Sequence, residues 1–315
     1  MDERRNSLNS PVASVVICTR NRGGLVVEAL ESVLANTYSS FELLLLDQST
    51  NLETEAAAAA YGFDSRFRYL HSDTVGTGVS RHLGLLEARG KYVLYTDDDC
   101  TVERNWVETI VRIFEESEET AVIFSSVAPA EYDTRLGVIP SYEYDEERTI
   151  SSLPAYYRSI GMGAGMSVRR DAVLGIGGFD KNLGPGSPFK SGEDHDVAVR
   201  ALLKGWSVRE TKQVAVTHYG YRTLSQFREL TGRDWFSIGA VYAKSMKAGN
   251  PSVIVLLVYN LLVRGFWLPL TLLFQFQKPQ GFKRSVYLLQ GFFAGLKTPV
   301  KKDMILYELR QPAEA

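Results

Sequence analysis

Short apolar runs alternate with helical segments through the first hundred residues, and this alternation constrains the fold more than any other feature of the sequence. The predicted strands are 14–19, 41–46, 67–70 and 92–96. The predicted helices between them are 25–35, 56–60 and 75–87. Nearly continuous apolar runs are typical of strands that are buried on both faces. The alternation therefore predicts an α/β fold with a mostly parallel, Rossmann-like sheet, right-handed crossovers and flanking helices.

The composition fits a globular protein whose charge is unevenly distributed. Hydrophobic residues make up 45% of the 315 positions and charged residues 23%. The net charge is −2, but from Val241 onward ten Lys and Arg residues face three Asp and Glu, which leaves −9 for residues 1–240. An acidic body with a basic, apolar tail does not suit a nucleic-acid binder. Cys18 and Cys100 lack paired spacing, and the first residues are polar, so we expect reduced cytosolic thiols and no signal peptide.

Three consecutive carboxylates, Asp97, Asp98 and Asp99, follow the fourth predicted strand. Such carboxylates repel one another, and a hard divalent cation removes that repulsion because its preferred ligands are oxygen atoms. In open α/β sheets, ligands bind at the carboxyl ends of the strands, where this run falls. The run therefore predicts a site for Mn²⁺ or Mg²⁺, and a solvated acidic turn is the alternative.

Seven sequence blocks together resemble a known family. They are Ser-Val-Val-Ile-Cys-Thr-Arg-Asn-Arg (14–22), the strand that ends at Asp47, 76–84, 90–99, 161–169, 177–180 and 192–196. In this order and spacing they are similar to family-2 glycosyltransferases with the GT-A fold, over roughly residues 12–220. No motif could be placed between 128 and 160. The resemblance implies transfer of a sugar from a nucleoside diphosphate sugar to an acceptor hydroxyl.

The resemblance also assigns roles on the donor side. Metal ligation falls to Asp99 and Asp97 of an Asp-x-Asp motif, and His218 completes the metal shell. The donor is further expected to contact Thr19, Arg20, Asp47, Arg81, Asp98, Gly163, Ala164 and Gly165. Thr19 and Arg20 would line the base and ribose pocket, and Asp47 would accept a hydrogen bond from the base. Simpler structural roles remain alternatives: a helix start at Asp47, a surface position for Arg81, a strand end at His218 and a glycine turn at 163–165.

A catalytic base is the second chemical requirement, because an acceptor hydroxyl has a very high pKa. The family pattern places this base in the pair Glu193-Asp194, with single displacement and inversion at the anomeric carbon. The same residues also fit a capping box, with Ser191 as the N-cap and Asp194 at the third helical position. The two interpretations are compatible, since a helix N-terminus favours an ionised carboxylate.

The chain changes character after residue 222. A helix is predicted over 224–247, and the apolar run 253–274 is long enough to cross a bilayer. Arg264 and Pro269 argue against a lone spanning helix, so we favour helices that lie on the membrane surface. A spanning segment and an oligomer interface remain alternatives. The basic residues expected near anionic headgroups are Lys278, Lys283, Arg284, Lys297, Lys301 and Lys302.

These inferences give one functional hypothesis. Residues 1–12 form a flexible N-terminus, 13–222 a catalytic domain with a donor half (13–127) and an acceptor half (128–222), and 223–315 a helical, membrane-associated region. The expected donor is a UDP-sugar, or else a dTDP- or GDP-sugar, and the acceptor is a glycan or lipid-linked glycan at the cytoplasmic face of the membrane. A homo-oligomer remains an option. One alternative is a sugar-phosphate nucleotidylyltransferase, although residues 20–24 only weakly resemble the glycine-rich loop of that class. The other is a non-catalytic nucleotide-sugar binder.

Overall fold

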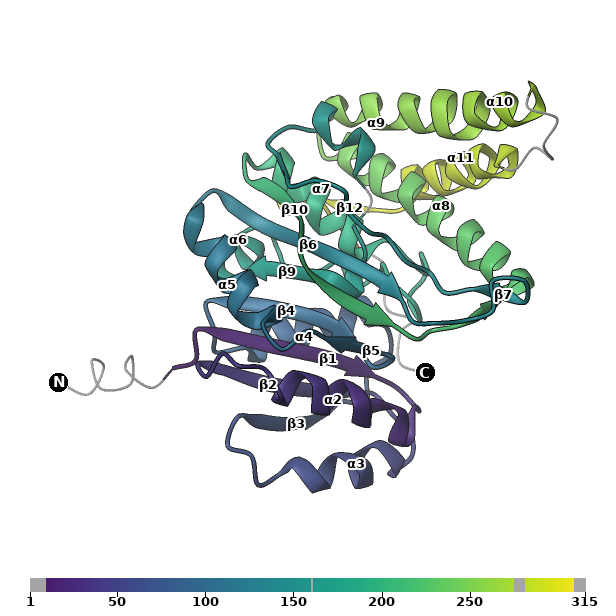
Figure 1. Ribbon diagram of the computed structural model, residues 1–315. Coiled ribbons are helices and arrows are strands. Elements are labelled where there is room, and N and C mark those ends of the chain that lie inside the picture. Colours follow the sequence, from purple (N-terminus) through teal and green to yellow (C-terminus); the bar gives the residue numbers. More distant parts are fainter. Residues whose placement is uncertain (1–9, 160, 275–280, 309–315) are drawn as a thin grey trace, which may run out of the picture.

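The computed structural model describes residues 10–159, 161–274 and 281–308, and its centre is a nine-stranded mixed sheet with helices on both faces (Figure 1). The strand order is β3-β2-β1-β4-β9-β6-β10-β5, and β8 pairs with β10. Of the N-terminus predicted to be flexible, residues 1–9 lie outside the described ranges, as does Lys278, whereas the backbone N–H of Val12 donates to the carbonyl of Ser40. A layer of C-terminal helices lies at one end of the sheet, above β10 in Figure 1.

The first half of the chain forms the predicted parallel sheet. Its strands are β1 (Ala13–Thr19), β2 (Phe41–Asp47), β3 (Phe67–His71) and β4 (Tyr92–Asp97), and its helices are η1 (Gly23–Leu25), α2 (Val26–Leu34), α3 (Glu53–Ala58), η2 (Ala59–Tyr61) and α4 (Thr77–Glu87). All pairings among these strands are parallel. Thr19 pairs with Asp47, and Cys18 pairs with Asp97. The polar residues that follow β1, β2 and β4 therefore meet at one edge of the sheet.

The second half of the sheet has mixed directions. Its elements are β5 (Cys100–Val102), α5 (Trp106–Glu116), β6 (Thr120–Pro129), β7 (Gly137–Val138), β8 (Arg148–Ile150), η3 (Pro154–Arg158), η4 (Gly163–Gly165), β9 (Met166–Arg169), α6 (Arg170–Gly175), α7 (Glu193–Leu203), β10 (Ser207–His218) and β11 (Arg222–Thr223). Strand β9 lies antiparallel between β4 and β6, and β10 is parallel to β6. Strand β5 pairs antiparallel with β10, so that Cys100 lies opposite His218. This pairing brings His218 beside the acidic run.

Two hydrophobic clusters cover the two faces of the sheet, which explains why the strands are apolar at nearly every position. Val15 and Ile17 of β1 face the cluster that contains Leu30 of α2. Val16, between them, faces the other cluster, which contains Val241 from the C-terminal helices. The C-terminal region therefore shares a core with the α/β body.

Among the C-terminal helices, α11 packs against both α8 and η6. Their bounds are α8 (Leu224–Lys247), η5 (Pro251–Val253), α9 (Ile254–Tyr259), the π-helix η6 (Asn260–Trp267), α10 (Leu268–Phe274) and α11 (Phe282–Lys297), followed by β12 (Val300–Lys301) and β13 (Leu306–Tyr307). The predicted helix 224–247 is confirmed. Helices α8 and α11 pack at backbone contact, because a side-chain carbon at Gly239 would collide with the carbonyl of Leu288, and one at Gly291 with that of Phe236.

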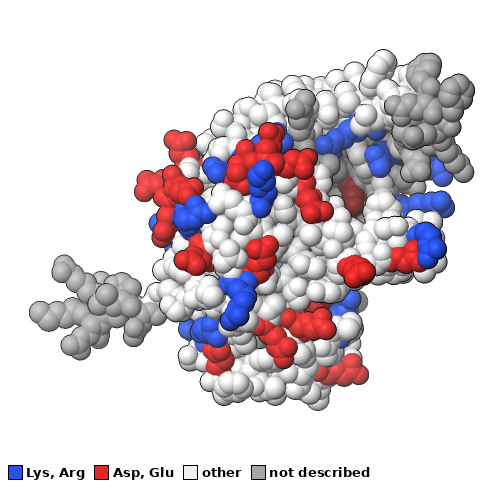
Figure 2. All heavy atoms as spheres, viewed as in Figure 1, with Lys and Arg blue, Asp and Glu red and all other residues white. Residues whose placement is uncertain are grey.

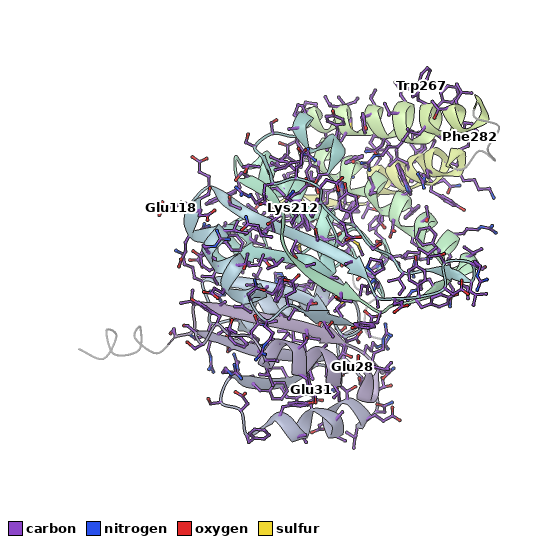
Figure 3. All side chains as sticks on the ribbon, in the orientation of Figure 1. Glu28, Glu31, Glu118, Lys212, Trp267 and Phe282 are labelled. Carbon is purple, nitrogen blue, oxygen red and sulfur yellow. The ribbon has the colours of Figure 1, made fainter. Side chains whose placement is uncertain are left out.

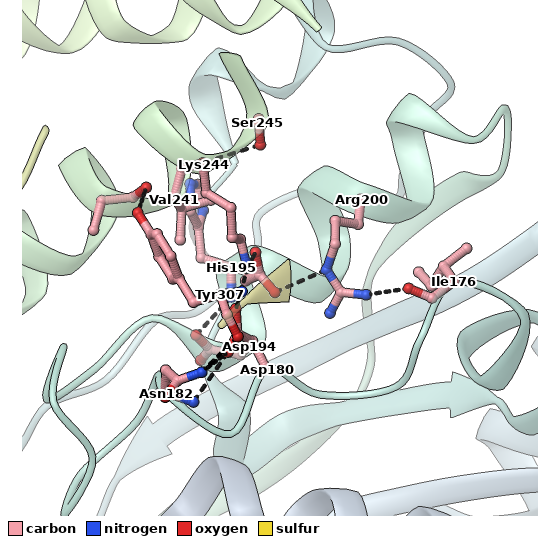
Figure 4. Close-up of polar contacts among 12 residues, drawn as sticks. Ile176, Asp180, Asn182, Asp194, His195, Arg200, Val241, Lys244, Ser245 and Tyr307 are labelled. Atoms are coloured by element: carbon pink, nitrogen blue, oxygen red, sulfur yellow. Dashed lines mark hydrogen bonds and ion pairs between the residues drawn. The ribbon is translucent and has the colours of Figure 1, made fainter. Parts of the chain in front are cut away.

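Buried charges join α8 to the body (Figure 4). The Lys244 ammonium lies 2.6 Å from Asp180 Oδ2 and 2.7 Å from Asp196 Oδ1. Asp196 also pairs with Arg200 along α7, at 2.8 Å. The backbone N–H of Tyr307 in β13 donates to Asp180 Oδ2 at 2.8 Å. Lys244 and Asp196 have no exposed side-chain surface, so the four elements are held together by a fully desolvated network.

One helix among the described residues, Pro251–Thr271, is long and apolar enough to cross a membrane, and a third of its 18-residue apolar window is buried in the protein. Its exposed side chains are mostly apolar, and they continue onto α11. Figure 3 places Trp267 and Phe282 at the outer end of this helical layer, while the labelled charged residues Glu28, Glu31, Glu118 and Lys212 lie on the α/β body. The layer therefore presents an apolar face where the body presents charge.

Candidate active site

A cleft of about 860 Å³ lies at the carboxyl ends of β1 and β4, between the sheet and the C-terminal helices. Figure 2 shows a hollow on this side of the molecule, with Lys and Arg side chains along its upper wall beneath the helical layer. The predicted site residues all line the cleft except Asp47 and Gly165. The fold thus brings together residues from the first strand to the last long strand of the sheet.

The three carboxylates of the acidic run point in different directions. Asp98 turns inward and accepts a hydrogen bond from Thr19 Oγ1 at 2.7 Å. Burial raises the pKa of Asp98 to about 6. Asp97 faces Arg81, with 3.0 Å between Oδ1 and Nη2. Asp99 faces His218, with 3.4 Å between Oδ1 and Nε2. All three carboxylates line the cleft, and Asp98 is the most buried of them and is tied to Thr19 of β1.

Asp99 and His218 have the chemistry of a divalent-cation site. The carbonyl of Pro140 lies 2.7 Å from His218 Nδ1 and can only accept, so Nδ1 carries a proton and Nε2 faces the Asp99 carboxylate. A backbone carbonyl on the far nitrogen is the usual orientation device for a metal-ligating histidine. A side chain at position 220 would fill the adjoining space, since its Cβ would lie 2.5 Å from His218 Nε2 and 2.9 Å from Asp99 Oδ2. Gly220 keeps that space free of a side chain.

Burial lowers the pKa of His218, but its hydrogen bonds to Asp99 and Pro140 outweigh burial and raise the pKa above its usual value. The surroundings of His218 therefore favour its charged form. Cys100 also lies within reach of both groups, but burial raises the pKa of its thiol far above the usual range, which makes it a poor ligand.

Arg81 connects the acidic run to the predicted base. Its guanidinium is almost fully buried and donates to Asp97 Oδ1 at 3.0 Å and to Glu193 Oε1 at 2.7 Å. Burial opposes the charge of Arg81, but the carboxylates around it keep its pKa above the usual value. Arg81 is not the surface arginine that the sequence left as an alternative. Its guanidinium bridges Asp97 on one side of the cleft and Glu193 on the other.

Glu193 and Asp194 have different environments although they are adjacent. Glu193 is buried against Arg81, and burial raises its pKa to about 7. Asp194 is partly exposed to the cleft, and its Oδ1 accepts from the backbone N–H of His195 at 2.7 Å. Burial also raises the pKa of Asp194, against the opposing charge of Arg81. The pair thus consists of one carboxylate fixed in an ion pair and one that faces the cleft.

The capping-box interpretation of this segment is wrong. Helix α7 begins at Glu193, and its N-cap is Gly192, in the left-handed region at φ 82°. The hydroxyl of Ser191 donates instead to Asp234 of α8, at 2.6 Å. The N-cap residue makes no side-chain hydrogen bond to this helix, and Asp194 in the first turn accepts the backbone N–H of His195.

Two predicted donor contacts lie away from the cleft. Asp47 is fully buried, and its oxygens accept from the Ser49 backbone at 2.8 Å and from the Tyr69 hydroxyl at 2.8 Å. Its neighbour Gln48 lines the cleft instead. Gly165 is packed against the carbonyl of Ser125. Asp47 ends β2 and Gly165 ends the 3-10 turn η4, as the sequence predicts for a strand end and a glycine turn, but neither residue faces the cleft.

The position of Arg81 explains why residue 163 is a glycine. A side-chain carbon at Gly163 would collide with the guanidinium of Arg81. This glycine is therefore required for the position of Arg81, whatever ligand lies beyond it. Ala164, next to it, lines the cleft and is buried.

Sequence reasoning missed several cleft residues. Arg22 lies 3.6 Å from Asp98 Oδ2 and 3.4 Å from Asp99 Oδ2, and its only sequence signal was its place in the turn after β1. Arg222, Arg264 and Arg284 reach the cleft from β11, η6 and α11. No motif marks these three, because Arg222 depends on the pairing of β11 with β7, and Arg264 and Arg284 depend on how the C-terminal helices pack.

Comparison with known proteins agrees with this geometry. The family model for glycosyl transferase family 2 matches residues 14–174. A glucosyl-dolichyl phosphate glucuronosyltransferase of Haloferax volcanii is 29% identical over 221 residues, which cover 67% of this chain and 70% of that protein. The glycosyltransferase GlyG of Streptococcus pneumoniae is 33% identical over 116 residues, which cover 36% of this chain and 38% of GlyG.

Solved structures share the fold at low sequence identity. The mannosyltransferase PcManGT from Pyrobaculum calidifontis, in complex with GDP-Man and Mn²⁺, superposes with a TM-score of 0.61 at 16% identity, covering 91% of this chain and 88% of that one. S. aureus TarS 1–349 superposes with a TM-score of 0.58 at 17% identity, covering 90% and 81%. The GT-A type fold predicted from the sequence is confirmed. The chain belongs to glycosyl transferase family 2, and it is a glycosyltransferase.

Proposed function

We propose that this protein transfers a sugar from a nucleoside diphosphate sugar to an acceptor hydroxyl, in a metal-dependent reaction that inverts the anomeric carbon. The observation that carries the proposal is that Glu193 and Asp194 have different surroundings. Arg81 holds Glu193 in an ion pair at 2.7 Å, whereas Asp194 faces the cleft with a raised pKa. A raised carboxyl pKa lies nearer the operating pH, which suits a general base.

The donor end of the cleft provides for a nucleotide and a cation. Asp99, His218 and Asp97 would hold Mn²⁺ or Mg²⁺, and the bound ion would offset the negative charge that develops on the departing diphosphate. Thr19, Arg20 and Gln48 line the part of the cleft nearest β1 and β2, where a base and ribose would lie. Arg22 and Arg222 add positive charge around Asp99. A UDP-sugar is the favoured donor, with dTDP- and GDP-sugars as alternatives.

In the proposed reaction, Asp194 removes the proton of the acceptor hydroxyl as its oxygen attacks the anomeric carbon. The new glycosidic bond forms while the bond from that carbon to the diphosphate oxygen breaks, so that one displacement inverts the configuration. Glu193 acts through Arg81 as a positioning residue, because it has no free path to the acceptor. Arg81 in turn keeps Asp97 and the first turn of α7 at a fixed separation.

The acceptor is proposed to be a lipid-linked glycan at the cytoplasmic face of the membrane, in the assembly of a surface polysaccharide or glycolipid. The apolar outer face of the helical layer supports a position on the bilayer surface. The name of the Haloferax relative describes a lipid-linked substrate, glucosyl-dolichyl phosphate. In this organisation, residues 13–127 bind the donor, 128–222 carry the base, and 223–315 place the cleft beside the membrane.

Donor hydrolysis and binding together test the proposal. Purified protein would be incubated with UDP-, dTDP- and GDP-sugars, with Mn²⁺ or with EDTA, and the released nucleotide measured. At least one donor should be hydrolysed with metal only, and Asp194→Asn should lower transfer or hydrolysis by about 10²-fold while nucleotide binding persists. Asp234→Asn is the matched control, because it removes a neighbouring carboxylate with a pKa raised by burial to about 6. Full turnover in Asp194→Asn would show that another group is the base.

A further inference from the structure

Two arginines from the C-terminal helices lie together in the cleft without a carboxylate partner. Arg264 is in the π-helix η6 and Arg284 in the first turn of α11, and both line the cleft. Each side chain is half-buried. Among the described residues, neither arginine forms an ion pair with an acidic side chain. Arg81 and Arg200, which are buried near the predicted base, each have one.

The contacts that these arginines do make leave their charge uncompensated. Arg264 donates to the backbone carbonyl of Tyr157 at 3.3 Å and lies over the ring of Tyr259, at 5.9 Å from its centroid. Arg284 lies over the ring of Trp235, at 5.6 Å. Burial, together with the nearby charge of Arg264, lowers the pKa of Arg284. Two like charges held this close in a partly desolvated cleft are costly unless an anion binds between them.

The surroundings indicate what kind of anion this is. His195, which follows the predicted base, is close enough to Arg264 for that charge to help burial lower its pKa to about 4. On the opposite side of the helices, large apolar side chains are exposed to solvent. Leu262, Phe266 and Trp267 in η6 are 60%, 54% and 58% exposed, and Val286 and Phe293 in α11 are 53% and 56% exposed. The arginines thus lie between the base and an apolar surface.

We propose that Arg264 and Arg284 form a binding site for the phosphate of an amphiphilic acceptor, in which a phosphate or diphosphate joins the sugar to a hydrocarbon chain. The sugar hydroxyl would reach toward Asp194, and the chain would run along the exposed face of η6 and α11. This inference rests on the proposed function, because it describes the acceptor of that reaction. It assigns the cationic end of the cleft to the acceptor and the metal end to the donor.

Direct binding of a soluble probe tests the site without turnover. Farnesyl phosphate combines one phosphate with a short hydrocarbon chain, and farnesol is its uncharged counterpart. Binding would be followed by calorimetry on the full chain without donor or metal. Farnesyl phosphate should bind more tightly than farnesol, and Arg264→Gln and Arg284→Gln should each weaken it by about tenfold or more, as expected for a lost charge-assisted hydrogen bond. Lys283→Gln is the matched control, since Lys283 is an exposed cation next to Arg284.

Three results would overturn the proposal. Unchanged farnesyl phosphate affinity in both arginine variants would show that the pair does not bind the phosphate. Inorganic phosphate that competes as well as farnesyl phosphate would make the site a general anion site rather than one for an amphiphile. A loss of Mn²⁺-dependent UDP or GDP affinity in the same variants would assign the arginines to the donor. Failure of the proposed function appears separately, as absent donor hydrolysis in a protein that still binds farnesyl phosphate.

Discussion

Replacing Lys244 by methionine should destabilise the protein more than any surface change, because it removes the cation from a fully buried network. Methionine has a similar length and fills the same space, so the change isolates the charge. Asp180 and Asp196, at 2.6 and 2.7 Å from the ammonium, would lose their shared cation in the core. Asp196 keeps Arg200, but Asp180 keeps only backbone and amide donors near Tyr307 and Asn182.

The expected loss follows from the cost of an uncompensated buried charge. Removing one partner of a buried ion pair typically costs about 3–5 kcal/mol, out of a total stability of about 5–15 kcal/mol. At about 2–4 °C for each kcal/mol in a chain of this size class, the melting temperature should fall by roughly 6–20 °C. Urea unfolding and calorimetry measure both quantities. Lys302→Met, which removes an exposed lysine, is the matched control and should change stability by less than about 0.5 kcal/mol.

The pH dependence gives an independent check on the same pair. Burial would raise the pKa of Asp180, but Lys244 and the backbone donors outweigh it and hold the pKa below its usual value. Because the folded pKa lies below the unfolded one, this carboxylate stabilises the protein above about pH 4, and that contribution is lost as the pH falls through the folded pKa. In Lys244→Met the carboxylate has no cation, so acidification from neutral pH to about pH 4 should recover stability relative to wild type.

A double variant identifies the source of the loss. Asp180→Asn in the Lys244→Met background should restore part of the stability, because the orphaned carboxylate becomes a neutral amide. The reasoning is refuted if Lys244→Met loses less than about 1 kcal/mol and follows the wild-type pH profile. That outcome would mean that water or a rearranged side chain compensates the two carboxylates.

Three further predictions concern the cleft and the apolar layer. Asp99→Ala should abolish the Mn²⁺-dependent part of nucleotide affinity in a thermal-shift titration, and unchanged metal-dependent affinity in the folded variant would remove Asp99 from the metal site. Arg81→Lys should lower transfer by at least about tenfold with a smaller change in nucleotide affinity, because a single ammonium cannot bridge Asp97 and Glu193 as a guanidinium fork does; wild-type kinetics would contradict the bridge. Leu262→Ser combined with Phe266→Ser should reduce co-sedimentation with anionic liposomes at equal stability, and high salt should weaken wild-type binding. A wild-type protein that ignores liposomes would leave an oligomer interface as the better explanation for the layer.

The parallel half of the fold was predictable because its signals are local. Each of the four strands from Ala13 to Asp97 is an apolar run, and a helical segment separates each strand from the next. The antiparallel insertion of β9 between β4 and β6 is not local. It depends on packing between segments that are far apart in sequence, such as Tyr92 and Arg169 or Val122 and Val168, and no periodic sequence pattern marks such pairs.

The candidate site follows the same division. The acidic run, Asp194 and His218 reach the cleft because each terminates a strand or begins a helix at the carboxyl edge of the sheet. Asp47 also ends a strand, but its side chain turns inward to Tyr69, and that rotation cannot be read from a one-residue motif. The arginines from η6 and α11 were unpredictable as site residues. Their residue type signalled only a basic tail, and the packing of α11 on α8 decides where they point.

The bridge that the Arg81 guanidinium forms between Asp97 and Glu193 affects how the chain folds during its synthesis. Arg81 and Glu193 are 112 positions apart, so the donor half leaves the ribosome long before its second carboxylate exists. Until α7 is made, the guanidinium has Asp97 but not Glu193, and burying it in that state is unfavourable. In a nascent chain that ends before residue 193, the Arg81 guanidinium should therefore stay hydrated and without a fixed position. We therefore expect the donor-side residues around Arg81 to reach their final arrangement only after α7 has been made.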